Sequence, residues 1–173
     1  DFRLYQKLIR HDYHEIDMDS SDTFMTFCVL FSFIPEKFHV YNIANQNKKE
    51  CRRIDATFEA LQKCGVDIKV VNDEIIIHGK KTYPTNKDII YLDCYDDHRL
   101  VMSFSLLASK MNNIVLSNYK AVSKTYPSFW EDMKQLGLDY DYYFDSPMCN
   151  TDIFAVKDVI VLIGMPGIGK STY

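Results

Sequence analysis

The sequence predicts an α/β fold made of two copies of a βαβαββ unit. Three observations lead to this prediction: short apolar strands alternate with helical patterns, the order of elements repeats, and matching residues recur 76 positions apart. The chain has 173 residues, 47% of them hydrophobic, which is enough for a packed core. We therefore expect two similar units that pack side by side.

The first copy is expected between residues 14 and 78. Its elements are a strand at 14–18, a helix at 23–33, a strand at 38–42, a helix opening at Asn45, and a hairpin of strands 67–71 and 74–78 around Asn72-Asp73. Ser20, Ser21 and Asp22 offer N-caps for the first helix, which is apolar on nearly all sides and should be buried. Gly65 should end the second helix as a C-cap.

The second copy repeats this order after a polar loop. Its expected elements are a strand at 89–93, a helix opened by residues 96–99 and apolar through 100–108, a strand at 114–116, a helix through 129–136 and a strand at 138–144. Gly137 should end the last helix. Pairs separated by 76 positions are Asp17 and Asp93, Asp22 and His98, Leu30 and Leu106, Asn42 and Asn118, and Lys48 and Lys124. Five matches at one offset indicate an internal repeat.

The stretch from Asn45 to Ile54 is the most distinctive part of the chain. Positions 48–53 hold four basic residues and one carboxylate, although the net charge of the chain is -4. We expect these residues to open a helix, on which Lys49 and Arg53 share a face and Glu50 lies three residues before Arg53. Cations over the first turn of a helix suit a phosphate or carboxylate ligand, while the simpler alternative is a solvated basic face.

The repeat favours the ligand-binding interpretation. It places Asp22 and the run Asp97-His98-Arg99 at matching helix starts, and Lys48-Lys49 and Lys124 at the starts of the second helices. If the units pack side by side, these helix N-termini converge. The result would be a site for a ligand with several negative charges.

Composition limits the other function classes. The sequence pI of about 5.7 argues against a nucleic-acid partner. No apolar run reaches the roughly 18 residues of a membrane span, and we find no signal peptide. The five cysteines form no CxxC pair, so we expect reduced thiols in a cytosolic protein with no metal site among them.

Four segments resemble the C-terminal half of the EPSP synthase family, and the resemblance covers roughly residues 13–144. They are Asp17 to Asp22, Asn45 to Arg53, Asp96-Asp97-His98-Arg99 and Lys124-Thr125-Tyr126-Pro127. The resemblance implies half of an inverse α/β barrel and transfer of the enolpyruvyl group of phosphoenolpyruvate to the 5-hydroxyl of shikimate 3-phosphate, without metal or organic cofactor. Both substrates are phosphorylated carboxylates, which explains the need for cations and proton-transfer groups.

The resemblance also implies a role for each matching residue. Asp22 matches the carboxylate that takes the hydroxyl proton, Glu50 a candidate acid, and His98 a supporting polar group. Asp22, Asn45 and Lys49 match the residues that contact shikimate 3-phosphate, and Lys49 also matches a catalytic residue. Arg53, Arg99 and Lys124 match the residues that contact phosphoenolpyruvate. The chain departs from the family pattern at Asn47, Arg52 and Ala121, and the change at Asn47 is the one expected to weaken substrate binding.

A second motif lies near the C-terminus. Residues 159–163 have the pattern of a buried strand, and Gly164-Met165-Pro166-Gly167-Ile168-Gly169-Lys170-Ser171 matches the P-loop pattern G-x-x-x-x-G-K-[ST]. Such a loop cradles nucleotide phosphates, so we expect ATP binding there, with Lys170 on the terminal phosphates and Ser171 on Mg²⁺. The residues of this motif are similar to those of the shikimate kinase P-loop.

The order of the two segments is similar to that in pentafunctional AROM polypeptides. This similarity implies an incomplete EPSP synthase part at 1–146, a linker at 147–157 and the first strand and P-loop of a kinase at 158–173, with the other domains of the same polypeptide as partners. We expect these 173 residues alone to be inactive, because a domain that closes over the substrates is absent. The alternatives are a UDP-N-acetylglucosamine-type enolpyruvyl transferase and a nucleotide-binding module with a non-catalytic scaffold.

Overall fold

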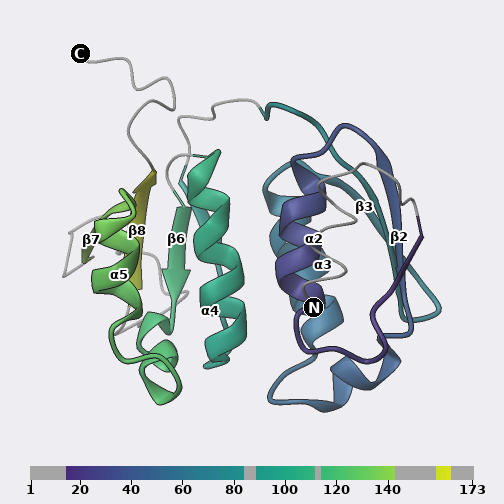
Figure 1. The fold of residues 1–173 in the computed structure, drawn as a ribbon, viewed down its shortest axis with the longest axis horizontal. Coiled ribbons are helices and arrows are strands. Elements are labelled where there is room, and N and C mark those ends of the chain that lie inside the picture. Colours follow the sequence, from purple (N-terminus) through teal and green to yellow (C-terminus); the bar gives the residue numbers. More distant parts are fainter. Residues whose placement is uncertain (1–14, 84–88, 112–113, 143–158, 165–173) are drawn as a thin grey trace, which may run out of the picture.

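The computed structural model describes residues 15–83, 89–111, 114–142 and 159–164. Figure 1 shows two sheets with helices α2, α3 and α4 between them. The described residues share one hydrophobic core, which draws on both sheets and on these helices. The predicted α/β class is therefore confirmed.

The first sheet has the strand order β1-β2-β4-β3. Its unit comprises β1 (Glu15–Asp17), α2 (Phe24–Ser32), β2 (Lys37–Tyr41), the 3-10 helix η1 (Ala44–Lys48), α3 (Arg53–Lys63), β3 (Asp67–Val71) and β4 (Glu74–His78). β1 pairs with β2 in parallel, while β4 is antiparallel to both β2 and β3. Asn72 and Asp73 both have positive φ, as a tight hairpin turn requires, so the predicted hairpin is confirmed.

The second sheet repeats this arrangement with the order β5-β6-β8-β7. Its unit comprises β5 (Ile90–Leu92), α4 (His98–Ser105), the 3-10 helix η2 (Leu106–Ser109), β6 (Ile114–Ser117), the 3-10 helix η3 (Tyr119–Lys124), α5 (Phe129–Gln135), β7 (Asp139–Tyr142) and β8 (Val159–Gly164). β5 and β6 are parallel, and β8 runs antiparallel to both β6 and β7. The position of β8 between β6 and β7 corresponds to that of β4 in the first sheet.

The internal repeat is visible in the backbone itself. Three pairs of non-glycine residues with positive φ lie 76 positions apart: Asp19 and Tyr95, Ser20 and Asp96, and Asn42 and Asn118. Both units also end their second helix with a glycine at positive φ, Gly65 in one and Gly137 in the other. In each, the glycine N–H and the next N–H donate to carbonyls of the last helical turn, which is a Schellman motif.

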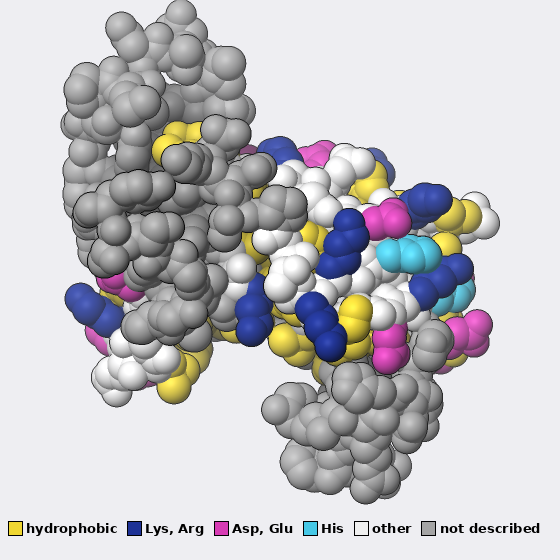
Figure 2. Space-filling model, turned by 90° about the horizontal axis from the view of Figure 1, so that it is seen from above, with side chains coloured by type: hydrophobic (Ala, Val, Ile, Leu, Met, Phe, Trp, Pro, Cys, Tyr) yellow, Lys and Arg dark blue, Asp and Glu magenta, His cyan; other side chains and the backbone are white. Residues whose placement is uncertain are grey.

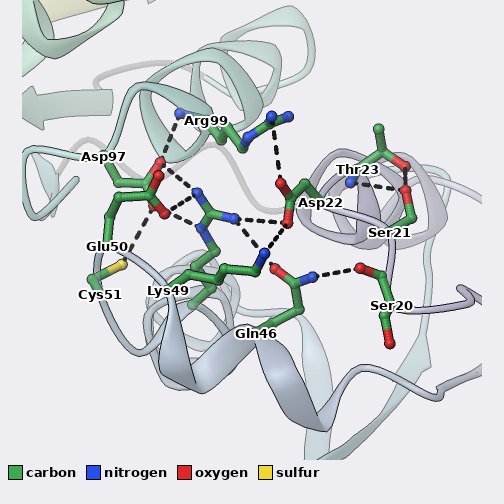
Figure 3. Close-up of polar contacts among 11 residues, drawn as sticks. Ser20, Ser21, Asp22, Thr23, Gln46, Lys49, Glu50, Cys51, Asp97 and Arg99 are labelled. Carbon is green, nitrogen blue, oxygen red and sulfur yellow. Dashed lines mark hydrogen bonds and ion pairs between the residues drawn. The ribbon is translucent and has the colours of Figure 1, made fainter.

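Helices α2 and α4 bring the two units together. The Thr26 and Ser103 hydroxyls form a hydrogen bond of 2.9 Å between these helices. Phe24, Phe31 and Phe104 are completely buried, as the apolar patterns predicted. The N-termini of α2, α3 and α4 consequently lie at one end of the packed units, where the candidate site forms (Figure 3).

Two expectations about helix starts are wrong. The basic stretch does not open one continuous helix, because η1 ends at Lys48, Lys49 is extended, and α3 begins only at Arg53. Asn47 Oδ1, from η1, accepts a hydrogen bond from Ile54 N at 2.9 Å and so satisfies one free N–H in the first turn of α3, whose N-cap residue Arg52 makes no side-chain cap. At α2 the N-cap is Thr23 and no side chain caps it, so the Asp22 carboxylate is not used as a cap.

The predicted strand at 159–163 is present as β8, paired within the second sheet. The linker at 147–157 and P-loop residues 165–171 lie outside the described residues, so the expected division of the chain into domains stays a prediction. In Figure 2, basic side chains on the visible face lie among acidic, apolar and uncharged ones. Within the described ranges, no helix has the length and apolar character needed to cross a membrane.

Candidate functional site

The candidate site lies where three helices begin. Asp22 precedes α2, Arg53 is the first residue of α3, and Asp97 and Arg99 stand at the start of α4 (Figure 3). Lys49 and Glu50 come from the extended segment between η1 and α3. The structure thus brings together side chains from three of the four helix starts that the repeat predicted to converge, whereas Lys124, from the fourth, pairs with Asp96 outside this cluster.

Arg53 is the centre of this cluster, and its side chain is completely buried. Its Nε donates to Asp97 Oδ2 at 2.7 Å, and its two terminal nitrogens contact Asp22 Oδ1 at 3.1 Å and Glu50 Oε2 at 2.6 Å. Burial alone lowers the pKa of Arg53, but the hydrogen bond and charge of Asp97, with the charges of Glu50 and Asp22, raise the pKa above its ordinary value. Arg53 therefore remains a cation.

Asp22 faces cations from both units. Besides Arg53, its carboxylate lies 3.5 Å from Lys49 Nζ and 3.4 Å from Arg99. Burial by itself raises the pKa of Asp22, but the Gln46 amide and the charges of Arg53, Arg99 and Lys49 outweigh burial and lower the pKa below its ordinary value. Asp22 is therefore ionised at neutral pH, and it is also partly open to solvent, with 30% of its side chain exposed.

Asp97 is fully buried and contacts both units. Its Oδ1 caps α4 by accepting the Arg99 N–H at 2.8 Å, while its Oδ2 accepts from Arg53. Cys51 Sγ lies 3.7 Å from the same Oδ2, and burial together with the Asp97 charge raises the pKa of Cys51 to about 12. Cys51 is thus a neutral thiol rather than a nucleophile.

Gln46 completes the buried side of the site. Its Nε2 donates to the Ser20 carbonyl at 2.8 Å, and its Oε1 accepts from Arg53 at 3.3 Å. Sequence reasoning missed Gln46 and gave Asp97 no separate role. The one available signal was that Asp97 belongs to a run matching a family motif, whereas nothing in the sequence marks Gln46 as buried.

The remaining predicted residues lie at or beyond the rim. Lys124 pairs with Asp96 at 2.7 Å, and both side chains are more than half exposed. Asn45 is exposed in η1, and His98 is the half-buried first residue of α4. The arrangement therefore has a buried, ion-paired arginine (Arg53), a partly exposed carboxylate (Asp22) and an outer set of cations.

Asn47 makes structural hydrogen bonds, and the expected effect of its departure from the family pattern on substrate binding stays a prediction. It accepts the Ile54 N–H and also donates to Asp55 Oδ1 at 3.1 Å. Arg52, the second departure, points outward and pairs with Asp55 at 2.6 Å. Among the residues that the structure describes, no group of three or more His, Cys, Asp or Glu side chains is arranged to hold a metal ion.

The comparisons with known proteins show the family of the chain. A family model described as EPSP synthase (3-phosphoshikimate 1-carboxyvinyltransferase) matches residues 5–133, which contain every residue of the cluster. Pentafunctional AROM polypeptides from Pneumocystis carinii and Eremothecium gossypii are 34% and 35% identical to the chain, and each match covers 91% of it. A third, from Kluyveromyces lactis, is 36% identical over 77% of the chain. The chain spans only 11% of the length of the first two relatives.

Solved structures support the same fold. The chain is similar to two structures of EPSP synthase from Acinetobacter baumannii, with TM-scores of 0.59 and 0.57 and sequence identities of 24% and 21%. Each match covers 66% of this chain and 26% of the other protein. At these identities the likeness establishes the fold alone.

Proposed function

Because this chain belongs to the EPSP synthase family, we propose that it supplies half of the active site of a 3-phosphoshikimate 1-carboxyvinyltransferase. The observation that carries the proposal is the set of cations from two units around the Asp22 carboxylate. A ligand that carries both a phosphate and a carboxylate needs several cations at fixed positions. The reaction would belong to the shikimate pathway, which leads to the aromatic amino acids, and would need no metal or organic cofactor.

The proposed roles follow the positions of the side chains. Asp22 would accept the proton of the 5-hydroxyl, because it is ionised and partly open to solvent. Lys49 and the exposed Asn45 would bind shikimate 3-phosphate, while Arg53, Arg99 and Lys124 would bind phosphoenolpyruvate. Glu50 is half exposed and lies 2.6 Å from Arg53, so it can present a carboxyl group to a ligand bound there. His98 would support this group as a polar neighbour.

The test is enolpyruvyl transfer by the intact polypeptide. Asp22→Asn should lower kcat about 10²- to 10⁴-fold and change the two KM values far less than kcat, because proton transfer acts in the transition state. The control is Asp55→Asn, which removes an ion pair with Arg52 outside the cluster. A change confined to KM in the Asp22 variant would remove Asp22 from the role of base. The expectation that the 173 residues alone are inactive stays a prediction.

We also propose that the chain continues into a shikimate kinase, as part of a multi-domain AROM-type polypeptide in the cytoplasm. The P-loop motif at 164–171 directly follows the apolar strand pattern at 159–163, which is the sequence context such a loop requires. ATP and Mg²⁺ would then be needed for the kinase reaction alone. Lys170→Met in the intact polypeptide should abolish phosphorylation of shikimate and spare enolpyruvyl transfer. Loss of both activities would mean that the two segments do not act separately.

A further inference from the structure

We propose that Asp97 is a positioning residue that holds Arg53 of one unit and Arg99 of the other in register for one ligand. The inference rests on the proposed function, in which both arginines bind phosphoenolpyruvate. It assigns a role to a buried carboxyl group whose two oxygens are already bonded to the Arg53 side chain and to the Arg99 N–H. Its effect would pass entirely through the two arginines.

The contact with Arg53 fixes the direction of the guanidinium group. Asp97 Oδ2 accepts from Nε at 2.7 Å, and Oδ1 lies 3.5 Å from one terminal nitrogen. One edge of the planar group is therefore held by Asp97. The terminal nitrogens donate to Asp22 and Glu50, whose own side chains are partly exposed. A planar fork held along one edge presents its other donors in a defined direction.

The contact with Arg99 acts through the backbone. Asp97 Oδ1 accepts the Arg99 N–H at 2.8 Å and begins helix α4 there. The Arg99 side chain leaves this capped turn and comes within 3.4 Å of Asp22 Oδ2. One carboxyl group thus sets the places of two cations that lie 46 positions apart in the chain.

The internal repeat separates these two tasks. Ser21 stands 76 positions before Asp97, and its Oγ accepts the Thr23 N–H at 3.3 Å, two residues on, as Asp97 does with Arg99. The turn itself therefore needs only a side-chain oxygen, although at Ser21 it precedes the helix, whose N-cap residue is Thr23. The second carboxylate oxygen, which reaches Arg53, is the part of Asp97 that the turn does not require. An acid at this position is explained by the arginine across the unit boundary.

The experiment measures the KM values of the intact polypeptide for both substrates. Asp97→Asn keeps an oxygen for the helix cap and places an N–H group toward Arg53 Nε. We expect the KM for phosphoenolpyruvate to rise about 10- to 100-fold, because a misplaced binding group costs that much. The KM for shikimate 3-phosphate should change far less, since Lys49 and Asn45 do not depend on Asp97. Asp55→Asn is the matched control, because it neutralises a carboxylate that pairs with the neighbouring Arg52.

A second variant covers the possibility that Asp97→Asn does not fold with Arg53 unpaired. Asp97→Glu keeps the negative charge and shifts the guanidinium by one methylene, so it should fold and still raise the KM for phosphoenolpyruvate. An unchanged KM for phosphoenolpyruvate in a folded variant, or equal rises in both KM values, would overturn the positioning role. If the wild-type polypeptide does not turn over phosphoenolpyruvate at all, it is the proposed function that fails.

Discussion

The two units share a backbone but place different side chains on it. At the start of the first helix of unit one, Asp22 does not act as a helix cap and is partly exposed. At the start of the first helix of unit two, Asp97 is buried and caps the helix. At the start of the second helix, unit one has the buried Arg53, and unit two has Phe129 at the equivalent position, 76 residues on. The repeat therefore supplies a common backbone framework, while the ion-paired side chains gather where the start of α3 in unit one meets the start of α4 in unit two.

The second helices show this division most clearly. Aromatic rings pack at the start of α5. The ring centroids of Phe129 and Trp130 lie 5.0 Å apart, and those of Trp130 and Tyr140 lie 5.5 Å apart. The start of α3 instead holds a buried ion pair between Arg53 and Asp97. Loss of one ring would leave a cavity, whereas loss of one partner of the ion pair would leave an uncompensated buried charge.

The largest effect is expected from breaking the buried pair. Arg53→Met leaves Asp97 buried without its cation, which typically costs about 3–5 kcal/mol of stability. Hydrogen exchange of the α3 amides in the intact protein should measure this loss as local unfolding. Arg52→Met is the control, because the Arg52 side chain is 74% exposed and its pair contributes less than about 1 kcal/mol. Equal protection in the two variants would mean that the pair does not hold the units together.

A smaller effect should appear in anion binding. Asp22 occupies the three cations that a substrate anion would need, so Asp22→Asn should tighten the binding of inorganic phosphate. One partly exposed charge pair is worth up to about 1 kcal/mol, which corresponds to roughly a fivefold change in Kd. Titration calorimetry of the intact polypeptide with phosphate measures the change. Weaker binding by the variant would show that Asp22 organises the cations rather than competing for them.

The lowered pKa of Asp22 predicts a pH dependence of stability. A carboxyl group whose pKa is lower in the folded state stabilises that state above the unfolded pKa, which is about 3.9 for Asp. This contribution is lost as the pH falls below that value and through the lower folded pKa. The difference in α3 amide protection between wild type and Asp22→Asn should therefore shrink in this acidic range. A difference that stays constant from neutral to acidic pH would contradict the lowered pKa.

The smallest effect is expected at the rim of unit two. Lys124 and Asp96 form an ion pair of 2.7 Å, but their side chains are 58% and 67% exposed. Lys124→Met should change the amide protection of α4 by less than about 1 kcal/mol, because solvent screens exposed pairs. A loss as large as that of Arg53→Met would mean that Lys124 belongs to the structural cluster, and the contrast between rim and buried pair would fail.

Local sequence signals predicted most of the fold. Asn72-Asp73 predicted the hairpin, and Gly65 and Gly137 predicted the helix ends, because each of these residues is suited to a backbone conformation with positive φ. The repeat predicted that Asp22, Lys49 and Arg99 would converge, and they do. Helix starts were harder, because whether Asp22 or Asn47 accepts a hydrogen bond from a helix N–H depends on which backbone groups are already bonded.

The sequence by itself determined the α/β class, the tandem units and the identity of the residues that could bind anions. Hydrophobic periodicity, turn residues and matches at the 76-residue offset are properties of the sequence itself, so they can be recognised without coordinates. Only the tertiary structure decided that Arg53 is buried, that Asp97 is its partner, and that Gln46 joins them. The physical reason is that burial and ion pairing depend on which surfaces meet, and here they are surfaces of two different units.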